Sequence, residues 1–254
     1  MLSPARRHRL HSLAAKAAAK AENEFGDVRE DASVYLLQLA ELKNDQNLLR
    51  GIKSEIERAE HKAKLIPKYM PYVEGILSVE ERIPHMRDDI VTTIMLWCFD
   101  ADMFEEGLRI AEFALKYGLD MPDTFNRDTA SIVAEEIGNA AKAKHTEGEV
   151  FDIAILEKAN ALTSTFSMHD QIRAKLYVAM GRTYLQKELY ALAVTFLKRA
   201  IKHNENCGGK QELQKAERLL KKQLEENPPQ PLLNADGSPV VDDFCNQVYE
   251  DISS

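Results

Sequence analysis

The chain has 254 residues, of which 44% are hydrophobic and 29% are charged, and its formal net charge is -8. This length and composition are typical of a globular protein with a substantial core, and they exclude a disordered chain. The acidic balance argues against a protein that simply coats nucleic acid, and no apolar run is long enough for a membrane span or a signal peptide.

Residues 1–28 are predicted to form a basic N-terminal arm. The first 20 residues contain no Asp or Glu and hold five cations that we interpret as candidate contacts for DNA phosphates: Arg6, Arg7, Arg9, Lys16 and Lys20. The alanine-rich stretch from Leu10 to Ala21 favours a helix, which would place several of these cations along one side. The alternative interpretation is a solvated, ragged N-terminus.

Residues 29–78 are predicted to form a helical hairpin. One helix is expected from about Glu30 to Leu42, a turn at Asn44-Asp45, and a second helix from Gln46 to Ile66. Apolar residues of the second helix recur at alternating steps of four and three, which is coiled-coil spacing. Because one hairpin cannot bury all of this surface, we assign four residues to contacts between copies of the chain: Leu48, Leu49, Ile52 and Ile56. Prolines at 67, 71 and 84 are expected to break up the segment that follows.

Residues 79–227 are predicted to form a helical body. Asp88 to Pro122 reads as two helices joined by an elbow at Phe99–Met103, with Gly118 as the stop signal. Helices are expected at 128–144, 152–162 and 210–226. Between them, His169 to Asn204 has the residue spacing of a tetratricopeptide repeat (TPR), and the Asp88–Pro122 hairpin fits the same template 86 positions earlier (Gly107 to Ala193). The predicted fold is therefore all-α, with a TPR-like body.

Residues 228–254 are predicted to be a proline-rich linker and a flexible acidic tail. After Pro228 there are five acidic residues and no Lys or Arg. The acids are interleaved with apolar residues that we assign to docking of a partner: Val241, Phe244, Val248 and Tyr249. The alternatives are a tail packed on its own domain and a disordered tail.

Catalytic chemistry has little support in the sequence. Two groups of acidic residues are candidates for a two-metal site, but both fall at helix junctions, where acids commonly cap helices: Asp100, Asp102, Glu105 and Glu106, and then Glu147, Glu149 and Asp152. We predict no catalytic residue, no metal and no cofactor. Cys98 lies on an apolar helical face and is expected in the core. Three widely spaced cysteines favour a reducing compartment and hence the cytoplasm.

Several short stretches, in order, carry a family resemblance. They are Ser3-Pro4-Ala5 with Arg7-His8, Leu65-Ile66-Pro67, Met70-Pro71-Tyr72-Val73, Met95-Leu96-Trp97, Ala114 to Leu119, and Met121-Pro122. Together they resemble the GpM family, the small terminase subunits of temperate contractile-tailed phages. The resemblance covers roughly residues 1–205 and contains no catalytic signature.

The resemblance implies a small terminase subunit, often labelled the endonuclease subunit, that recognises double-stranded viral DNA at the packaging start, in the host cytoplasm and without a membrane. The residues themselves show no catalytic site to support that label. Such subunits generally assemble into rings, here a homo-oligomer, and hand the DNA to a large subunit that holds the ATPase and the nuclease. Two alternatives stay open, a metal-dependent endonuclease subunit of the terminase and a TPR-type adaptor with no DNA role.

Overall fold

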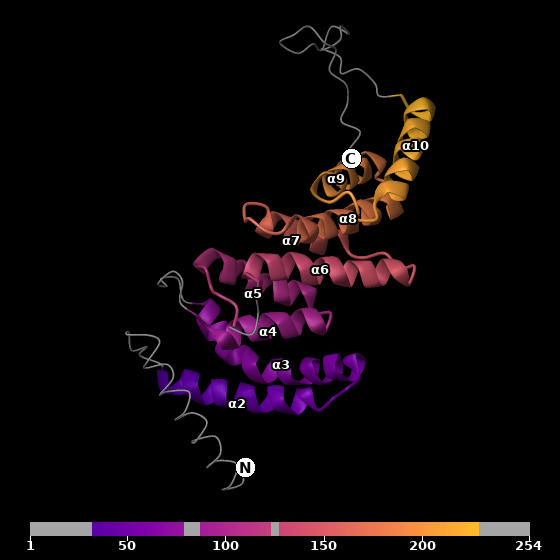
Figure 1. Cartoon of the computed structure of the whole chain (residues 1–254). Helices are drawn as coiled ribbons and strands as arrows, with labels where there is room; N and C mark the ends of the chain where they lie inside the picture. Colours follow the sequence, from indigo (N-terminus) through magenta and orange to yellow (C-terminus); the bar gives the residue numbers. More distant parts are fainter. Residues whose placement is uncertain (1–31, 79–86, 123–126, 229–254) are drawn as a thin grey trace, which may run out of the picture. The chain divides into compact units, whose positions relative to one another are not determined.

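The protein is helical wherever the structure describes regular elements. A computed structural model describes residues 32–78, 87–122 and 127–228, and this part of the chain contains helices and no strands (Figure 1). The all-α prediction is confirmed. The helices are α2 (Ala32–Arg50), α3 (Glu55–Leu77), α4 (Asp89–Asp100), α5 (Phe104–Tyr117), α6 (Thr129–Thr146), α7 (Ile153–Thr163), α8 (Asp170–Gln186), α9 (Tyr190–His203) and α10 (Lys210–Glu226). The basic arm and the acidic tail, with the DNA-contact and docking residues assigned to them, lie outside the described residues.

The chain divides into two compact units, Met1–Thr129 and Ala130–Ser254. In the first unit, α4 packs between α3 and α5, and α2 contacts both α3 and α4. In the second unit, α8 contacts α7 and α9, while α10 packs mainly on α9. None of the helices described is long and apolar enough to cross a membrane.

The turn predicted at Asn44-Asp45 is wrong, because α2 continues through both residues to Arg50. Asp45 does not cap a helix; its side chain is buried and accepts hydrogen bonds from α3. The chain turns instead after Gly51, and Ser54 caps α3 by accepting the backbone N–H of Glu57 at 3.3 Å. The single coiled-coil helix expected over 46–66 is therefore divided between the end of α2, a connection and the start of α3.

The prediction that prolines break up the segment after Ile66 is also wrong for Pro67 and Pro71, since both lie inside α3. Pro84 lies outside the described residues. Each proline removes one backbone N–H from the helix ladder. The two prolines are four residues apart and lie on the exposed side of α3. Water can therefore hydrate the backbone carbonyls that lose their N–H partner. The opposite side buries Ile66, Tyr69, Val73 and Ile76, and this packing holds the helix together.

The α4–α5 hairpin is confirmed. Asp88 caps α4 by accepting the backbone N–H groups of Ile90 and Val91, each at 3.2 Å. Gly118 ends α5 in the left-handed conformation, with φ of 64°. A Cβ added at Gly107 would lie 2.5 Å from Cε1 of Phe99, so only glycine permits the close approach of α4 and α5.

The elbow between α8 and α9 repeats the elbow between α4 and α5, 86 positions further along (Asp102 to Glu188). Both residues have left-handed backbone, with φ of 57° and 63°. In each elbow the next backbone N–H bonds a carbonyl five residues back, Met103 to Cys98 at 2.8 Å and Leu189 to Tyr184 at 2.9 Å. The helices that follow, α5 and α9, both have 14 residues. The two hairpins therefore share one elbow geometry, while the assignment to the TPR class stays a prediction.

Candidate functional site

Two acids of the first candidate catalytic group, Asp100 and Glu106, are engaged in contacts that join helices. Asp100 accepts a hydrogen bond from the ammonium of Lys62 on α3 at 2.5 Å. Glu106 pairs with Arg109, and the same guanidinium binds Glu74 of α3. Asp102 forms the left-handed elbow residue. These charges join α3 to α4 and α5, and the geometry does not gather them around a common point.

The second group of acids is also engaged at a helix junction. Glu147 and Glu149 both lie near the ammonium of Lys144, at 3.8 and 2.9 Å. Asp152 caps α7 by accepting the backbone N–H of Ala154 at 2.9 Å. Within the ranges that the structure covers, no three His, Cys, Asp or Glu side chains lie together in a way that could hold a metal ion.

Cys98 lies in the core, as expected. Its side chain is fully buried on α4. Burial raises the pKa of this thiol to about 12, and the nearby carboxylate of Glu106 acts in the same direction. A thiol with so high a pKa is almost entirely protonated at neutral pH, so it is a poor nucleophile.

A buried polar cluster fixes the orientation of α2. The carboxylate of Asp45, 3% exposed, accepts hydrogen bonds from the hydroxyl of Tyr69 at 2.6 Å and from the ammonium of Lys68 at 2.5 Å. Lys68 also pairs with Glu41 at 2.9 Å. Burial and the bond to Asp45 raise the pKa of the Tyr69 hydroxyl above its ordinary range. The ring of Tyr69 packs edge-on against Trp97 of α4, so the cluster joins α2, α3 and α4.

With α2 fixed in this way, a row of residues on another side of the helix is left uncovered. Val34 is 52% exposed, Leu37 47% and Leu48 62%. Glu41 and Asn44, both half-buried, continue the row between them, and the carboxylate of Glu41 is paired with Lys68. The steps of three, four, three and four residues are those of a coiled-coil seam. We call Val34, Leu37, Glu41, Asn44 and Leu48 the outer stripe.

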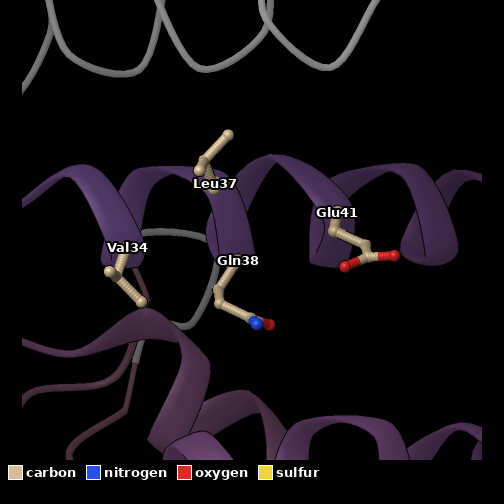
Figure 2. Close-up of a pocket in the computed structure, with 4 residues that line it drawn as sticks. All are labelled: Val34, Leu37, Gln38 and Glu41. Carbon is tan, nitrogen blue, oxygen red and sulfur yellow. The ribbon is translucent and has the colours of Figure 1, made fainter. Parts of the chain in front are cut away.

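A shallow hollow lies along this stripe, with a volume of about 240 Å³ (Figure 2). Among the described residues it is lined by Val34, Leu37, Gln38 and Glu41, all from α2. Their spacing, i, i+3, i+4 and i+7, outlines the diamond of side chains that one helix offers to a side chain of another.

The residues predicted to join copies of the chain divide into three kinds. Leu48 and Ile56 are exposed, at 62% and 76%, and Ile52 is half-buried in the connection between α2 and α3. Leu49 is only 5% exposed and contributes to the core of the first unit, which leaves it little surface for a partner. Sequence reasoning placed Val34 and Leu37 on a hairpin helix but did not assign them to contacts. The signal that could have found them is the heptad spacing, which runs unbroken through Asn44 to Leu48.

The described part of the molecule thus defines an all-helical protein with an apolar surface of the kind at which proteins associate. Residues 39–171 match the family model of the phage small terminase subunit, and the chain belongs to this family. Membership places the protein in phage DNA packaging. The family resemblance in the sequence is therefore confirmed.

Two curated relatives are similar over much of the chain. The terminase endonuclease subunit of Escherichia phage P2 is 36% identical over 228 residues, which are 90% of this chain and 90% of the relative. The probable terminase endonuclease subunit of Haemophilus phage HP1 is 22% identical over 189 residues, 69% of this chain and 66% of the relative. No solved structure matches the chain.

Proposed function

We propose that this protein is the packaging subunit that binds double-stranded viral DNA at the packaging start, assembles as a homo-oligomeric ring, and recruits the large terminase subunit in the host cytoplasm. The observation that carries the proposal is membership of the small terminase family, together with the similarity to the phage P2 protein over nearly the whole chain. The proposed plan has four parts: residues 1–28 contact DNA, 29–78 join copies, 79–227 form a TPR-like body, and 228–254 hold the linker and the docking tail.

DNA is proposed to bind the arm through its phosphates, at Arg6, Arg7, Arg9, Lys16 and Lys20. One copy of the arm carries few charges, but a ring presents many copies, and the resulting avidity offsets the acidic balance of the chain. Each Lys or Arg that neutralises a phosphate adds about 0.9 to the slope of log affinity against log salt. Phosphate contacts by the arm therefore have a measurable signature.

The test is the affinity of the full chain for duplex DNA over a range of salt concentrations. We expect Arg6→Ala with Arg7→Ala and Arg9→Ala to weaken binding and to flatten the salt slope. A matched control is Lys43→Ala with Lys53→Ala and Lys64→Ala, which removes three exposed cations of residues 29–78. If the control flattens the slope and the arm variant does not, the DNA site lies in the hairpin.

Assembly is proposed to use the hairpin of α2 and α3. Support comes from the exposed apolar side chains of the outer stripe and from Ile56 beside the connection. Fully burying a Leu or Ile side chain contributes about 1.5 to 3 kcal/mol, and a ring repeats the contact in each copy. Large apolar side chains that stay exposed on one stripe of a helix are candidates for a contact with another protein surface.

The acidic tail is proposed to dock the large subunit. Val241, Phe244, Val248 and Tyr249 supply apolar anchors, and the interleaved acids favour a partner groove lined with Lys or Arg. Deletion of Pro231 to Ser254 should remove the interaction with the large subunit and leave DNA binding unchanged. Unchanged capture of the large subunit by the truncated chain would place the docking site elsewhere.

A second candidate function is a metal-dependent endonuclease. The observation in its favour is that both curated relatives carry the name of an endonuclease subunit. The test is magnesium-dependent nicking of DNA by the purified protein, and its loss in Asp100→Ala or Asp102→Ala. A TPR-type adaptor with no DNA role is the remaining alternative, and salt-sensitive DNA binding by the intact chain would contradict it.

A further inference from the structure

We propose that α2 pairs with α2 of a second copy of the chain, antiparallel and through the outer stripe; this inference rests on the proposed self-association. The stripe has both parts of a knobs-into-holes contact, in which a side chain of one helix enters a gap between four side chains of another. The hollow lined by Val34, Leu37, Gln38 and Glu41 is the hole, and Leu48, 62% exposed, is the knob.

The order of residues along the stripe selects the antiparallel direction. In one register, Leu37 faces Leu48 of the second copy and Glu41 faces Asn44 of the second copy, and the twofold axis repeats both pairs. The apolar residues then meet each other, and the amide of Asn44 can donate a hydrogen bond to the carboxylate of Glu41. A parallel pair in register would instead place Glu41 opposite Glu41, and the ion pair of each carboxylate with Lys68 of its own chain, at 2.9 Å, offsets only part of the repulsion between these like charges.

The features of the hole and the knob favour a second copy over another occupant. The Asp45 cluster fixes the side of α2 that packs on the rest of the first unit, so the stripe cannot turn inward without breaking the bonds from Lys68 and Tyr69. Hole and knob lie on the same helix, about three turns apart. A twofold axis therefore brings the knob of each copy to the hole of the other, so α2 is complementary to a second α2. Beside the hole, Oε1 of Gln38 is buried and has no hydrogen-bond partner among the described residues.

A twofold contact closes on two copies, whereas a ring of more copies needs a second, different contact. Ile52 and Ile56 lie outside the proposed α2–α2 contact and are available for the second contact. The inference therefore divides the residues of the hairpin between two interfaces.

Disulfide cross-linking tests the register directly. The full chain is prepared with Cys207→Ser and Cys245→Ser, which leaves only the buried Cys98. Leu37→Cys and Leu48→Cys are introduced one at a time and together, and the proteins are oxidised mildly. Both positions are exposed, so neither change opens the core. A disulfide requires Cα atoms about 4.4 to 6.8 Å apart.

We expect covalent dimers from the chain with both cysteines, and from a mixture of the two single variants. Either single variant alone should give almost none, because equal residues in the proposed pair are offset by 11 positions, or roughly 16 Å along the helix. The control pairs Lys43→Cys, on another exposed part of α2, with Leu48→Cys and should also give almost none.

Two results would overturn the inference. One is efficient cross-linking of Leu48→Cys alone, which indicates a parallel pair. The other is the absence of cross-links in every combination, which is expected if residues 1–31 or another protein cover the stripe. The mass of the unoxidised protein in solution separates this failure from failure of the proposed function: an oligomer without cross-links assembles through another surface, whereas a monomer contradicts the proposed assembly itself.

Discussion

Helix α4 and the α2–α3 hairpin belong to the same unit but use their apolar residues differently. Nine of the twelve residues of α4 are buried, so its side chains are covered on almost every side by the chain itself. The hairpin also supplies core residues, among them Leu42, Leu49 and Tyr69, yet it leaves Val34, Leu37, Leu48 and Ile56 exposed.

The difference shows which apolar residues carry information about partners. Those of α4 are needed by the fold, and their pattern would be the same whatever the protein binds. Those left exposed on the hairpin serve no packing role among the described residues, and burying them against another surface would lower the free energy further. Exposed apolar residues in a regular row are therefore the better guide to function.

The largest predicted effect is a difference in stability between two isoleucine substitutions, one in each region. Ile94 of α4 is fully buried, and Ile56 at the start of α3 is 76% exposed. We expect Ile94→Ala to lower the free energy of unfolding by about 2 to 5 kcal/mol, because it leaves a cavity. Ile56→Ala should change it by about 0.5 kcal/mol or less. Urea unfolding followed through the fluorescence of Trp97, the single tryptophan, reports on this unit. Equal losses would remove the distinction between the two regions.

Two glycines extend the comparison to the space that each region leaves for a side chain. A Cβ at Gly107 would meet the ring of Phe99 on α4, whereas a Cβ at Gly75 of α3 would meet nothing within 4 Å. We expect Gly107→Ala to destabilise the unit by about 1 to 3 kcal/mol through overpacking. Gly75→Ala should stabilise it by about 0.5 to 1 kcal/mol, because alanine is the better helix former. Stabilisation by Gly107→Ala would show that α4 and α5 are not closely packed.

The smallest effect concerns a rate of modification and leaves stability unchanged. At pH 8 the raised pKa keeps almost all of the Cys98 thiol protonated, and burial also excludes the reagent. In a chain with Cys245→Ser, iodoacetamide should modify the half-buried Cys207 and spare Cys98, as measured by mass spectrometry of the native protein. Modification of both at the same rate would mean that α4 opens readily.

Local signals explain which elements were predictable. Asp88 and Gly118 specify the ends of the α4–α5 hairpin through contacts within a few residues, and α10 has the bounds expected from its sequence. The turn at Asn44-Asp45 was wrong because the partner of Asp45 is Tyr69, 24 residues away and invisible to local patterns. The prolines of α3 were misinterpreted for the same reason. Tertiary packing of the opposite side of α3 keeps the segment helical, and a local pattern does not show that packing.

The candidate site was predictable in part. Coiled-coil spacing identified Leu48 and Ile56, which are exposed. The assignment also included Leu49, which does not fall on that spacing: it follows Leu48 directly, lies on an adjacent face of α2, and contributes to the core. The heptad spacing that starts at Val34 is present in the sequence, but it crosses the turn predicted at Asn44-Asp45, and that turn kept the outer stripe from being recognised.

The most direct test of the central claim, that the uncovered surface of α2 joins copies of the chain, is the mass of the full-length protein in solution by light scattering. The parent should be an oligomer. Leu37→Asp with Leu48→Asp should give a folded, smaller species, because two buried charges on each copy would oppose pairing. Lys43→Asp, which changes an exposed residue of the same helix outside the stripe, should keep the parent mass. An unchanged mass for the stripe variant would contradict the account.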